Sequence, residues 1–240
     1  MFYLIGIGFN EDDISAKATA AMKNCDAIYA EFYTNKWHGD LNKLTGKKIE
    51  IIDREKTESD FLVNEAEGKT VALLVSGDPL AATTHMELFI EAKKRNITVK
   101  IIHAPSVYTA IAETGLQLYK FGRVTTLVKP EKGFEPVSPY DVIVQNKSSG
   151  LHTLVLLDIG MTAKDGINLL LNMEKKKKRG IFLDDTMIVS CCCLGTDEQE
   201  IKYGSVSLLL STVSEKTPAA LVVPGQLHFK EEEALEMWKC

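Results

Sequence analysis

An apolar run, Val71–Val75, is followed at once by the turn-forming segment Ser76–His85, with the sequence Ser-Gly-Asp-Pro-Leu-Ala-Ala-Thr-Thr-His. In an open α/β sheet, a short buried strand that ends in this way delivers a side chain to the crevice above the strand ends. Asp78 is therefore the first candidate for a binding site. The alternative is an ordinary strand-to-helix turn, in which Gly77 supplies an unusual φ and Asp78 binds nearby amides.

Short strands alternate with helical segments throughout the first half of the chain. The patterns predict strands at residues 1–5, 27–32, 48–52, 70–75 and 97–102, and helices at 14–23, 58–68, 84–94 and 105–114. This alternation predicts an N-terminal α/β domain over residues 1–120, with a mostly parallel sheet covered on both faces.

A C-terminal α/β domain with a mixed sheet is expected over residues 121–240. The predicted strands are 123–128, 151–159, 186–194, 201–205 and 219–223, and the predicted helices are 140–147, 162–179 and 206–210, with a proline-rich loop over 130–139. The fold class is thus α/β, with two domains and a cleft between them.

Composition limits the possible partners. The formal net charge of −5 argues against a broad electrostatic grip on nucleic acid. No segment approaches the length of a membrane span, and the apolar Met1–Ile7 is too short for the core of a signal peptide, so we expect a cytoplasmic protein. The cysteines and histidines have no metal-ligand spacing, and no metal is expected. Cys191–Cys193 are expected to be small buried apolar side chains.

Familiar nucleotide and hydrolase motifs are missing from the sequence. Gly6 and Gly8 resemble the start of a dinucleotide fingerprint, but Glu11 stands where the third glycine is needed, and the carboxylates of residues 11–13 would repel a pyrophosphate. We expect Gly6 and Gly8 only to let a ligand approach the backbone closely. No Gly-x-Ser-x-Gly elbow and no P-loop lysine are present.

Three further strands end in polar or turn residues. These endings are His103–Ser106, Asp158–Gly160 and Pro224–His228. With Asp78, they form either a ligand pocket or a set of ordinary turns. Glu31, inside a predicted strand, is a candidate buried carboxylate. His228 is the histidine favoured for a functional role, because it follows a Pro-Gly turn at a strand end.

Several long segments, in order along nearly the whole chain, resemble the diphthine synthase family. They are Ala-Glu-Phe-Tyr-Thr at 30–34, Gly-Asp-Pro-Leu-Ala-Ala-Thr-Thr-His at 77–85, His-Ala-Pro-Ser-Val at 103–107, Gly-Leu-Gln-Leu-Tyr-Lys-Phe-Gly at 115–122, Leu-His-Thr-Leu-Val-Leu-Leu-Asp-Ile at 151–159 and Pro-Gly-Gln-Leu-His at 224–228. That family is similar in fold to the tetrapyrrole methylases.

The resemblance implies a homodimeric S-adenosylmethionine-dependent N-methyltransferase with the cofactor in the cleft between the two domains and S-adenosylhomocysteine as product. The implied substrate is a 3-amino-3-carboxypropyl group on one histidine of elongation factor 2, an intermediate of diphthamide biosynthesis. The cofactor contacts implied by the matching motifs are Phe9, Asp78, Ala81, Ser106, Val107, Leu157, Cys192 and His228.

Methyl transfer from a sulfonium is an in-line displacement, so positioning matters more than acid–base chemistry. An amine with a pKa of about 8 is about one-tenth deprotonated at pH 7, so no catalytic base is assigned. Two other functions stay open: a small-molecule methyltransferase acting on a tetrapyrrole or corrin, and a non-catalytic nucleotide-binding module.

Overall fold

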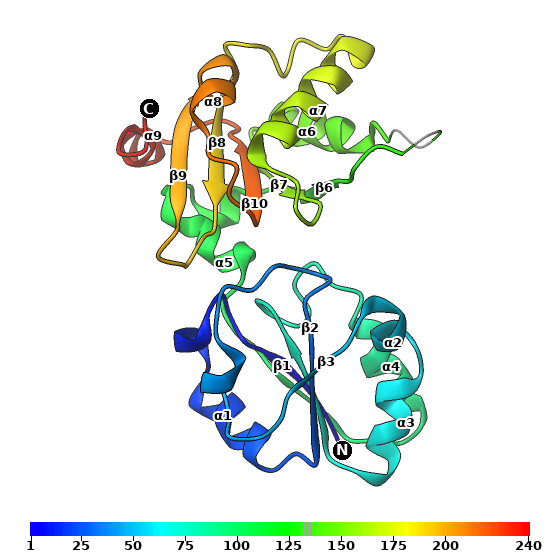
Figure 1. Cartoon of the computed structure of the whole chain (residues 1–240). Coiled ribbons are helices and arrows are strands. Elements are labelled where there is room, and N and C mark those ends of the chain that lie inside the picture. The colour runs from blue at the N-terminus through cyan, green and yellow to red at the C-terminus, as the bar shows by residue number, and fades with distance from the viewer. Residues whose placement is uncertain (132, 134–135) are drawn as a thin grey trace. The chain divides into compact units, whose positions relative to one another are not determined.

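The computed structural model describes residues 1–131, 133 and 136–240, which form two compact units, Met1–Thr109 and Ala110–Cys240 (Figure 1). Among the described residues, each unit combines helices with a five-stranded sheet. The predicted pair of α/β domains is therefore confirmed. The units divide at Thr109, whereas the sequence placed the boundary after residue 120. Residues 132, 134 and 135 of the predicted 130–139 loop lie outside the described residues.

Unit 1 is built on a parallel sheet with the strand order β3-β2-β4-β1-β5. Its strands are β1 (Phe2–Gly6), β2 (Ala27–Glu31), β3 (Glu50–Ile51), β4 (Val71–Val75) and β5 (Val99–Ile102). Every residue of β4 is buried, which matches the continuous apolar run expected for a strand covered on both faces.

Helices cover both faces of the unit 1 sheet. The helices are α1 (Ala16–Lys23), α2 (Arg54–Glu58), α3 (Phe61–Gly68), α4 (Met86–Lys94) and α5 (Val107–Ala110), with 3-10 turns at Glu11–Asp13 and Leu41–Lys43. In Figure 1, α1 lies on one side of the sheet and α2, α3 and α4 on the other. Met22 of α1 packs in a different cluster from Leu62 of α3 and Leu88 of α4. The neighbouring strands β1 and β4 are thus followed by helices on opposite faces, which makes a topological switch point.

The helix expected over 58–68 is present as α3 but begins later, at Phe61, and a separate short helix, α2, ends at Glu58. Asp53 caps the start of α2, because its side chain accepts a hydrogen bond from the backbone N–H of Lys56. Ser59 then adopts an extended conformation, and its hydroxyl accepts from Phe61 N at 3.2 Å. Short polar side chains compete for backbone groups in this way, and here they separate α2 from α3.

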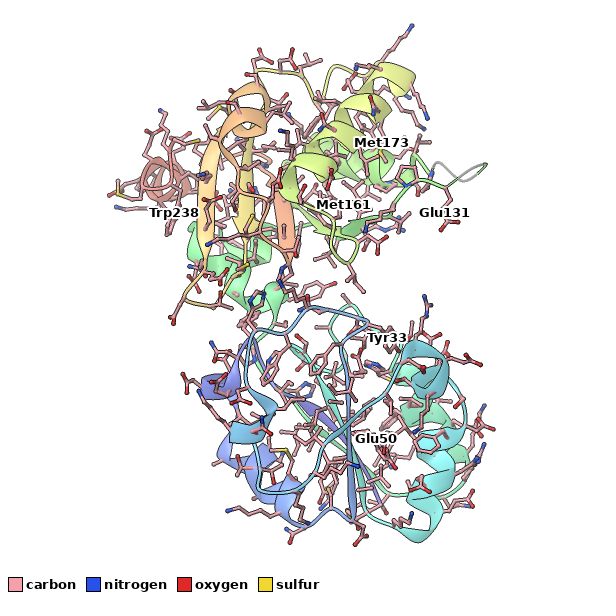
Figure 2. All side chains as sticks on the ribbon, in the orientation of Figure 1. Tyr33, Glu50, Glu131, Met161, Met173 and Trp238 are labelled. Carbon is pink, nitrogen blue, oxygen red and sulfur yellow. The ribbon has the colours of Figure 1, made fainter. Side chains whose placement is uncertain are left out.

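Unit 2 contains a mixed sheet with the order β6-β7-β10-β8-β9. Its strands are β6 (Thr125–Leu127), β7 (Thr153–Leu157), β8 (Met187–Cys192), β9 (Glu200–Ser205) and β10 (Ala219–Val223). Among the described strands of unit 2, only the β6–β7 pair is parallel. The core of the unit includes Met161 and Met173, which Figure 2 labels.

The helices of unit 2 are α6 (Ser138–Ser148), α7 (Ala163–Lys177), α8 (Val206–Thr212) and α9 (Phe229–Glu236), with 3-10 turns at Ile111–Thr114 and Leu118–Lys120. A capping box between Thr162 and Asp165 begins α7. Helix α9 was not predicted from the sequence. This helix begins at a second capping box, in which His228 takes the place of the usual Ser or Thr and Glu231 is the partner.

Candidate functional site

The loops after β1 and β4 are joined backbone to backbone at the switch point of unit 1. Gly77 N donates to Gly8 O at 2.8 Å, and Gly8 N donates to Gly77 O at 3.3 Å. The room expected beside Gly6 is filled, because an added Cβ would lie 2.6 Å from Gly77 O. An added Cβ on Gly8 would lie 2.2 Å from Asp13 Cβ. The prediction that these two glycines admit a ligand is therefore wrong. An added Cβ on Gly77 would lie 3.7 Å from Ser106 Cβ, an ordinary van der Waals distance, so the packing is looser there than beside Gly6 and Gly8.

In the loop after β1, a carboxylate accepts a hydrogen bond from a backbone amide of the same loop. Phe9 N donates to Asp13 Oδ2 at 2.8 Å, the contact that a bound phosphate would need. This hydrogen bond explains why the first Gly-x-Gly does not form a phosphate site.

Asp78 connects the loops after β4 and β5. Its Oδ1 accepts from Leu80 N at 3.0 Å, as the turn alternative requires. Its Oδ2 accepts from His103 Nδ1 at 2.7 Å and from Ala104 N at 3.3 Å. A carboxylate can accept roughly four hydrogen bonds, so this half-buried group keeps capacity for one more donor. Asp78 therefore both builds the turn and can bind a ligand hydroxyl or ammonium.

The other predicted residues of unit 1 lie on the same three loops. Phe9 follows β1, Ala81 follows Asp78 in a turn closed by Ala81 N and Asp78 O at 3.1 Å, and Ser106 and Val107 begin α5 after β5. Because β4, β1 and β5 are adjacent and parallel, their carboxyl ends meet at one edge of the sheet. The fold brings these five predicted contacts to that edge.

In unit 2, the predicted residues occupy two different edges of the sheet. Leu157 and Cys192 end β7 and β8 on either side of the start of β10, where Ala219 pairs with Cys192. His228 follows the other end of β10, because β10 runs antiparallel to both strands. Cys192 is fully buried in the core, and burial raises the pKa of its thiol. Cys191, Cys192 and Cys193 are all buried, as predicted.

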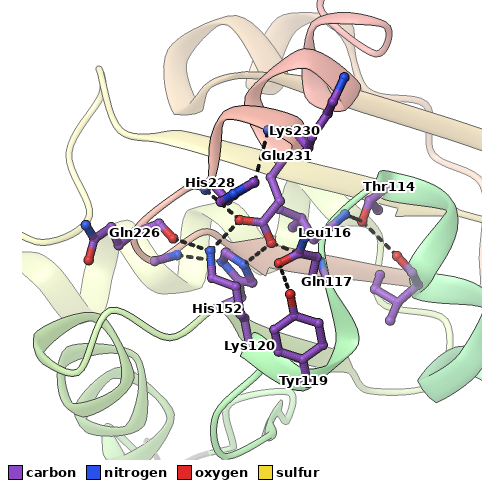
Figure 3. A network of polar contacts seen from close by, with 12 residues as sticks. Thr114, Leu116, Gln117, Tyr119, Lys120, His152, Gln226, His228, Lys230 and Glu231 are labelled. Atoms are coloured by element: carbon purple, nitrogen blue, oxygen red, sulfur yellow. Dashed lines mark hydrogen bonds and ion pairs between the residues drawn. The ribbon is translucent and has the colours of Figure 1, made fainter.

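A buried carboxylate that sequence reasoning missed lies beside His228. Figure 3 shows Glu231 at the centre of a polar network. The carboxylate accepts hydrogen bonds from Gln117 N at 2.9 Å, His228 N at 2.8 Å and His152 Nε2 at 3.0 Å, and forms an ion pair with Lys120 Nζ. Burial raises the pKa of Glu231, but these donors outweigh it, Lys120 foremost, and hold the pKa at about 2. The His-x-x-Glu spacing of a capping box was the available signal.

Glu31, the last residue of β2, is buried as the sequence analysis expected. Its carboxylate accepts from the hydroxyl and the N–H of Thr34. His85 Nε2 lies 3.6 Å from Glu31 Oε1 without a hydrogen bond, while His85 Nδ1 lies 3.3 Å from Pro79 O. Burial raises the pKa of Glu31 and lowers that of His85.

A groove of about 320 Å³ lies between α2, α3 and α4, lined in part by Tyr33, Glu58, His85 and Glu87. Its lining contains none of the predicted cofactor contacts. The loop edge with Asp78 has the polar groups and the backbone geometry of a binding site, so we assign the candidate site there rather than to the groove.

Comparison with known proteins decides the family. Residues 1–209 match the family model for Tetrapyrrole (Corrin/Porphyrin) Methylases. The chain is 41% identical over 251 residues to a diphthine synthase of Methanocaldococcus jannaschii, covering 98% of both chains. It is 42% identical to a diphthine synthase of Methanococcus aeolicus, covering 98% of this chain and 97% of that protein. The chain belongs to the diphthine synthase family of tetrapyrrole methylases.

Solved structures agree with this family. A crystal structure of a candidate diphthine synthase from Entamoeba histolytica matches with a TM-score of 0.93 and 36% identity, covering 100% of this chain and 98% of that chain. A second diphthine synthase crystal structure matches with a TM-score of 0.88 and 30% identity, covering 100% and 96%. The predicted family and the predicted enzyme class, a methyltransferase, are confirmed.

The described part of the chain contains neither a metal-binding cluster nor a membrane-spanning helix. Across residues 1–131, 133 and 136–240, no group of three or more His, Cys, Asp or Glu side chains could hold a metal ion. Within the same ranges, no helix is both long and apolar enough to cross a membrane.

Proposed function

We propose that this methyltransferase uses S-adenosylmethionine to methylate the amine of a 3-amino-3-carboxypropyl-histidine on elongation factor 2, the diphthine synthase step of diphthamide biosynthesis. The support is the full-length likeness to proteins named diphthine synthase, together with a site edge that fits the cofactor. Dimer formation and a cytoplasmic location remain predictions.

The edge at Asp78 carries the cofactor assignment. The half-buried Asp78 carboxylate has capacity for a ribose hydroxyl or the cofactor ammonium. Gly77, at the switch point between β1 and β4, is packed less tightly than Gly6 and Gly8. Phe9, Ala81, Ser106 and Val107 surround the same edge on three loops. We keep Leu157, Cys192 and His228 as predicted contacts from unit 2.

The cofactor would supply an electrophilic methyl group on a sulfonium. The protein then needs to align the acceptor amine with that methyl group and to limit access of water. The amine loses its proton to solvent at modest cost, since its pKa of about 8 leaves about a tenth of it neutral at pH 7. No protein base is required.

The decisive experiment is intact-mass spectrometry of elongation factor 2 bearing the unmethylated intermediate, incubated with the enzyme and S-adenosylmethionine. We expect mass gains in methyl-sized steps on the modified histidine, and their number separates amine trimethylation from added esterification of the carboxylate. If S-adenosylhomocysteine binds but no mass is gained, the acceptor is instead a small molecule such as a tetrapyrrole.

Substitution of Asp78 tests the cofactor site. Asp78→Ala removes the acceptor and the link to His103, and should weaken S-adenosylhomocysteine binding by roughly 10- to 100-fold, as expected for lost hydrogen bonds to a charged group. Isothermal titration calorimetry measures this loss. Asp26→Asn is the matched control, because Asp26 precedes β2 at the opposite edge of the same sheet and accepts from Thr70 N. Unchanged affinity in a folded Asp78→Ala variant would refute the site.

A further inference from the structure

The turn Pro224–His228 is held by hydrogen bonds at Gly225, Gln226 and His228. Gly225 N donates to His152 Nδ1 at 2.9 Å, and Gln226 N donates to Gly150 O at 3.0 Å. Lys120 Nζ donates to Gln226 O at 2.6 Å. The turn also lies so close to Gly150 that a Cβ on Gly225 would come within 2.5 Å of Gly150 O. Little freedom is left to the chain before it reaches His228.

Glu231 and His152 hold each other in one protonation state. Because His152 Nδ1 accepts the N–H of Gly225, the ring proton is on Nε2, where it is donated to Glu231 Oε1 at 3.0 Å. A second ring proton would face the Gly225 N–H. Burial lowers the pKa of His152 and so acts in the same direction. The pair is thus an ionised carboxylate with a neutral imidazole of defined tautomer.

The ring of His228 is oriented as a consequence. Its backbone N–H donates to Glu231 Oε2, and its Nδ1 accepts from Lys230 N at 3.3 Å (Figure 3). The ring also packs on Phe229, with centroids 4.2 Å apart. With Nδ1 accepting, a proton on the imidazole lies on Nε2, and the exposed ring can offer that N–H to a ligand.

We propose that Glu231 and His152 are positioning residues for cofactor binding by His228. A carboxylate at this place in the helix would cap α9 without being buried, yet Glu231 is fully buried and also collects Lys120 and Gln117 N. It therefore ties α9 to the segment before β6 and to the entry of β7. The proposal rests on the proposed function, in which His228 contacts S-adenosylmethionine.

A double-mutant cycle tests whether Glu231 acts through His228. The dissociation constant of S-adenosylhomocysteine is measured by calorimetry for the wild type, His228→Ala, Glu231→Gln and the double variant. Glu231→Gln keeps the shape but turns an NH₂ group towards donors. We expect Glu231→Gln to weaken binding about 5- to 10-fold in the wild type, and by less than about 2-fold in the His228→Ala background.

Steady-state kinetics provide a second test of the positioning role. Glu231→Gln should raise KM for S-adenosylmethionine while kcat stays within about 2-fold, because the lost interaction is one of binding. Glu233→Gln is the matched control, since Glu233 lies on the same helix and only pairs with exposed Lys230. If Glu231→Gln does not fold, as judged by a circular dichroism melt, Lys120→Met replaces it in the cycle.

The outcomes distinguish the positioning role of Glu231 and His152 from the proposed function. Equal losses in both backgrounds, or no loss in a folded Glu231→Gln variant, would overturn the positioning role. Unchanged binding by His228→Ala would overturn it as well. A wild type that does not bind S-adenosylhomocysteine refutes the proposed cofactor and the inference together. A wild type that binds it but does not methylate elongation factor 2 refutes only the proposed substrate, and the cycle still decides the inference.

Discussion

Glu31 in unit 1 and Glu231 in unit 2 are both completely buried, and each lies beside a buried histidine, yet their pKa values move in opposite directions. Glu31 has donors only from its own short loop, so burial dominates and raises its pKa. Glu231 accepts hydrogen bonds from three separate segments, and one of the donors is a lysine. Its pKa therefore falls to about 2. The number and charge of the donors, rather than the depth of burial, decide the charge of a buried carboxylate.

The two histidines differ in the same way. Both nitrogens of His152 have hydrogen-bond partners, whereas His85 Nε2 has none among the described residues and lies 3.6 Å from Glu31. A fully bonded polar network gives one defined arrangement, and an underbonded pair does not. The network of unit 2 is therefore a fixed structural centre, while the pair in unit 1 favours neutral groups.

The largest effect on stability should come from removing the Glu231 carboxylate. Glu231→Ala leaves the Lys120 ammonium and the His152 N–H without their partner, and should lower the free energy of unfolding by about 3–5 kcal/mol, as for a broken buried ion pair. Urea denaturation measures this loss. Glu233→Ala, on the exposed face of α9, should cost less than about 1 kcal/mol. A loss from Glu231→Ala no greater than that of the control would contradict the comparison.

An intermediate effect should appear on acidification. Because the folded pKa of Glu231 lies near 2, below its ordinary value of 4.5, its stabilisation is complete above pH 4.5 and is lost as pH falls towards 2. The stability gap between the wild type and Glu231→Gln should therefore shrink over that range. The groups that face this carboxylate are Lys120 and His152. Thermal melts from pH 6 to pH 3 measure the gap, and a gap that widens on acidification would show the sign to be wrong.

The smallest effect is expected for Glu31→Gln. Burial raises the folded pKa of Glu31, so its protonated form is the favoured one, and stability is lost as pH rises from its unfolded pKa to its folded pKa. A neutral amide resembles that form, and the substitution should change stability by less than about 1 kcal/mol at pH 5. Relative to the wild type, the variant should gain stability as pH rises to 8. Urea denaturation at pH 5 and pH 8 measures this difference. If Glu31→Gln is less stable than the wild type by the same amount at both pH values, Glu31 is ionised.

The parts of the fold that depend on local pattern could be predicted from the sequence. The run Val71–Val75 is apolar throughout because β4 is buried on both faces, and the turn residues after it mark the strand end. The helix α9 was missed because histidine is an unusual capping residue, and the apolar stripe of this short helix is weak. The break at Ser59 depends on one hydroxyl contact that helix periodicity does not encode.

The residues of the candidate site also differ in whether the sequence could group them. Once a parallel sheet is assumed, Asp78 and Ser106 must share an edge, so residues of unit 1 could be grouped from sequence. The place of His228 depends on the antiparallel direction of β10, which periodicity does not reveal. Glu231 contacts Gln117 across 114 residues of sequence, and no local signal joins those two positions.

The strand order of unit 1 has a consequence for synthesis on the ribosome. Among the described residues, the interior strand β1 pairs with β4 and β5 alone, and both are translated long after it. At about 5–20 residues per second, Phe2 and Leu4 wait for several seconds before α3 and α4, which cover them, have been made. Throughout that interval the nascent chain presents an apolar strand without a partner, so the emerging N-terminal half should be a target for ribosome-associated chaperones.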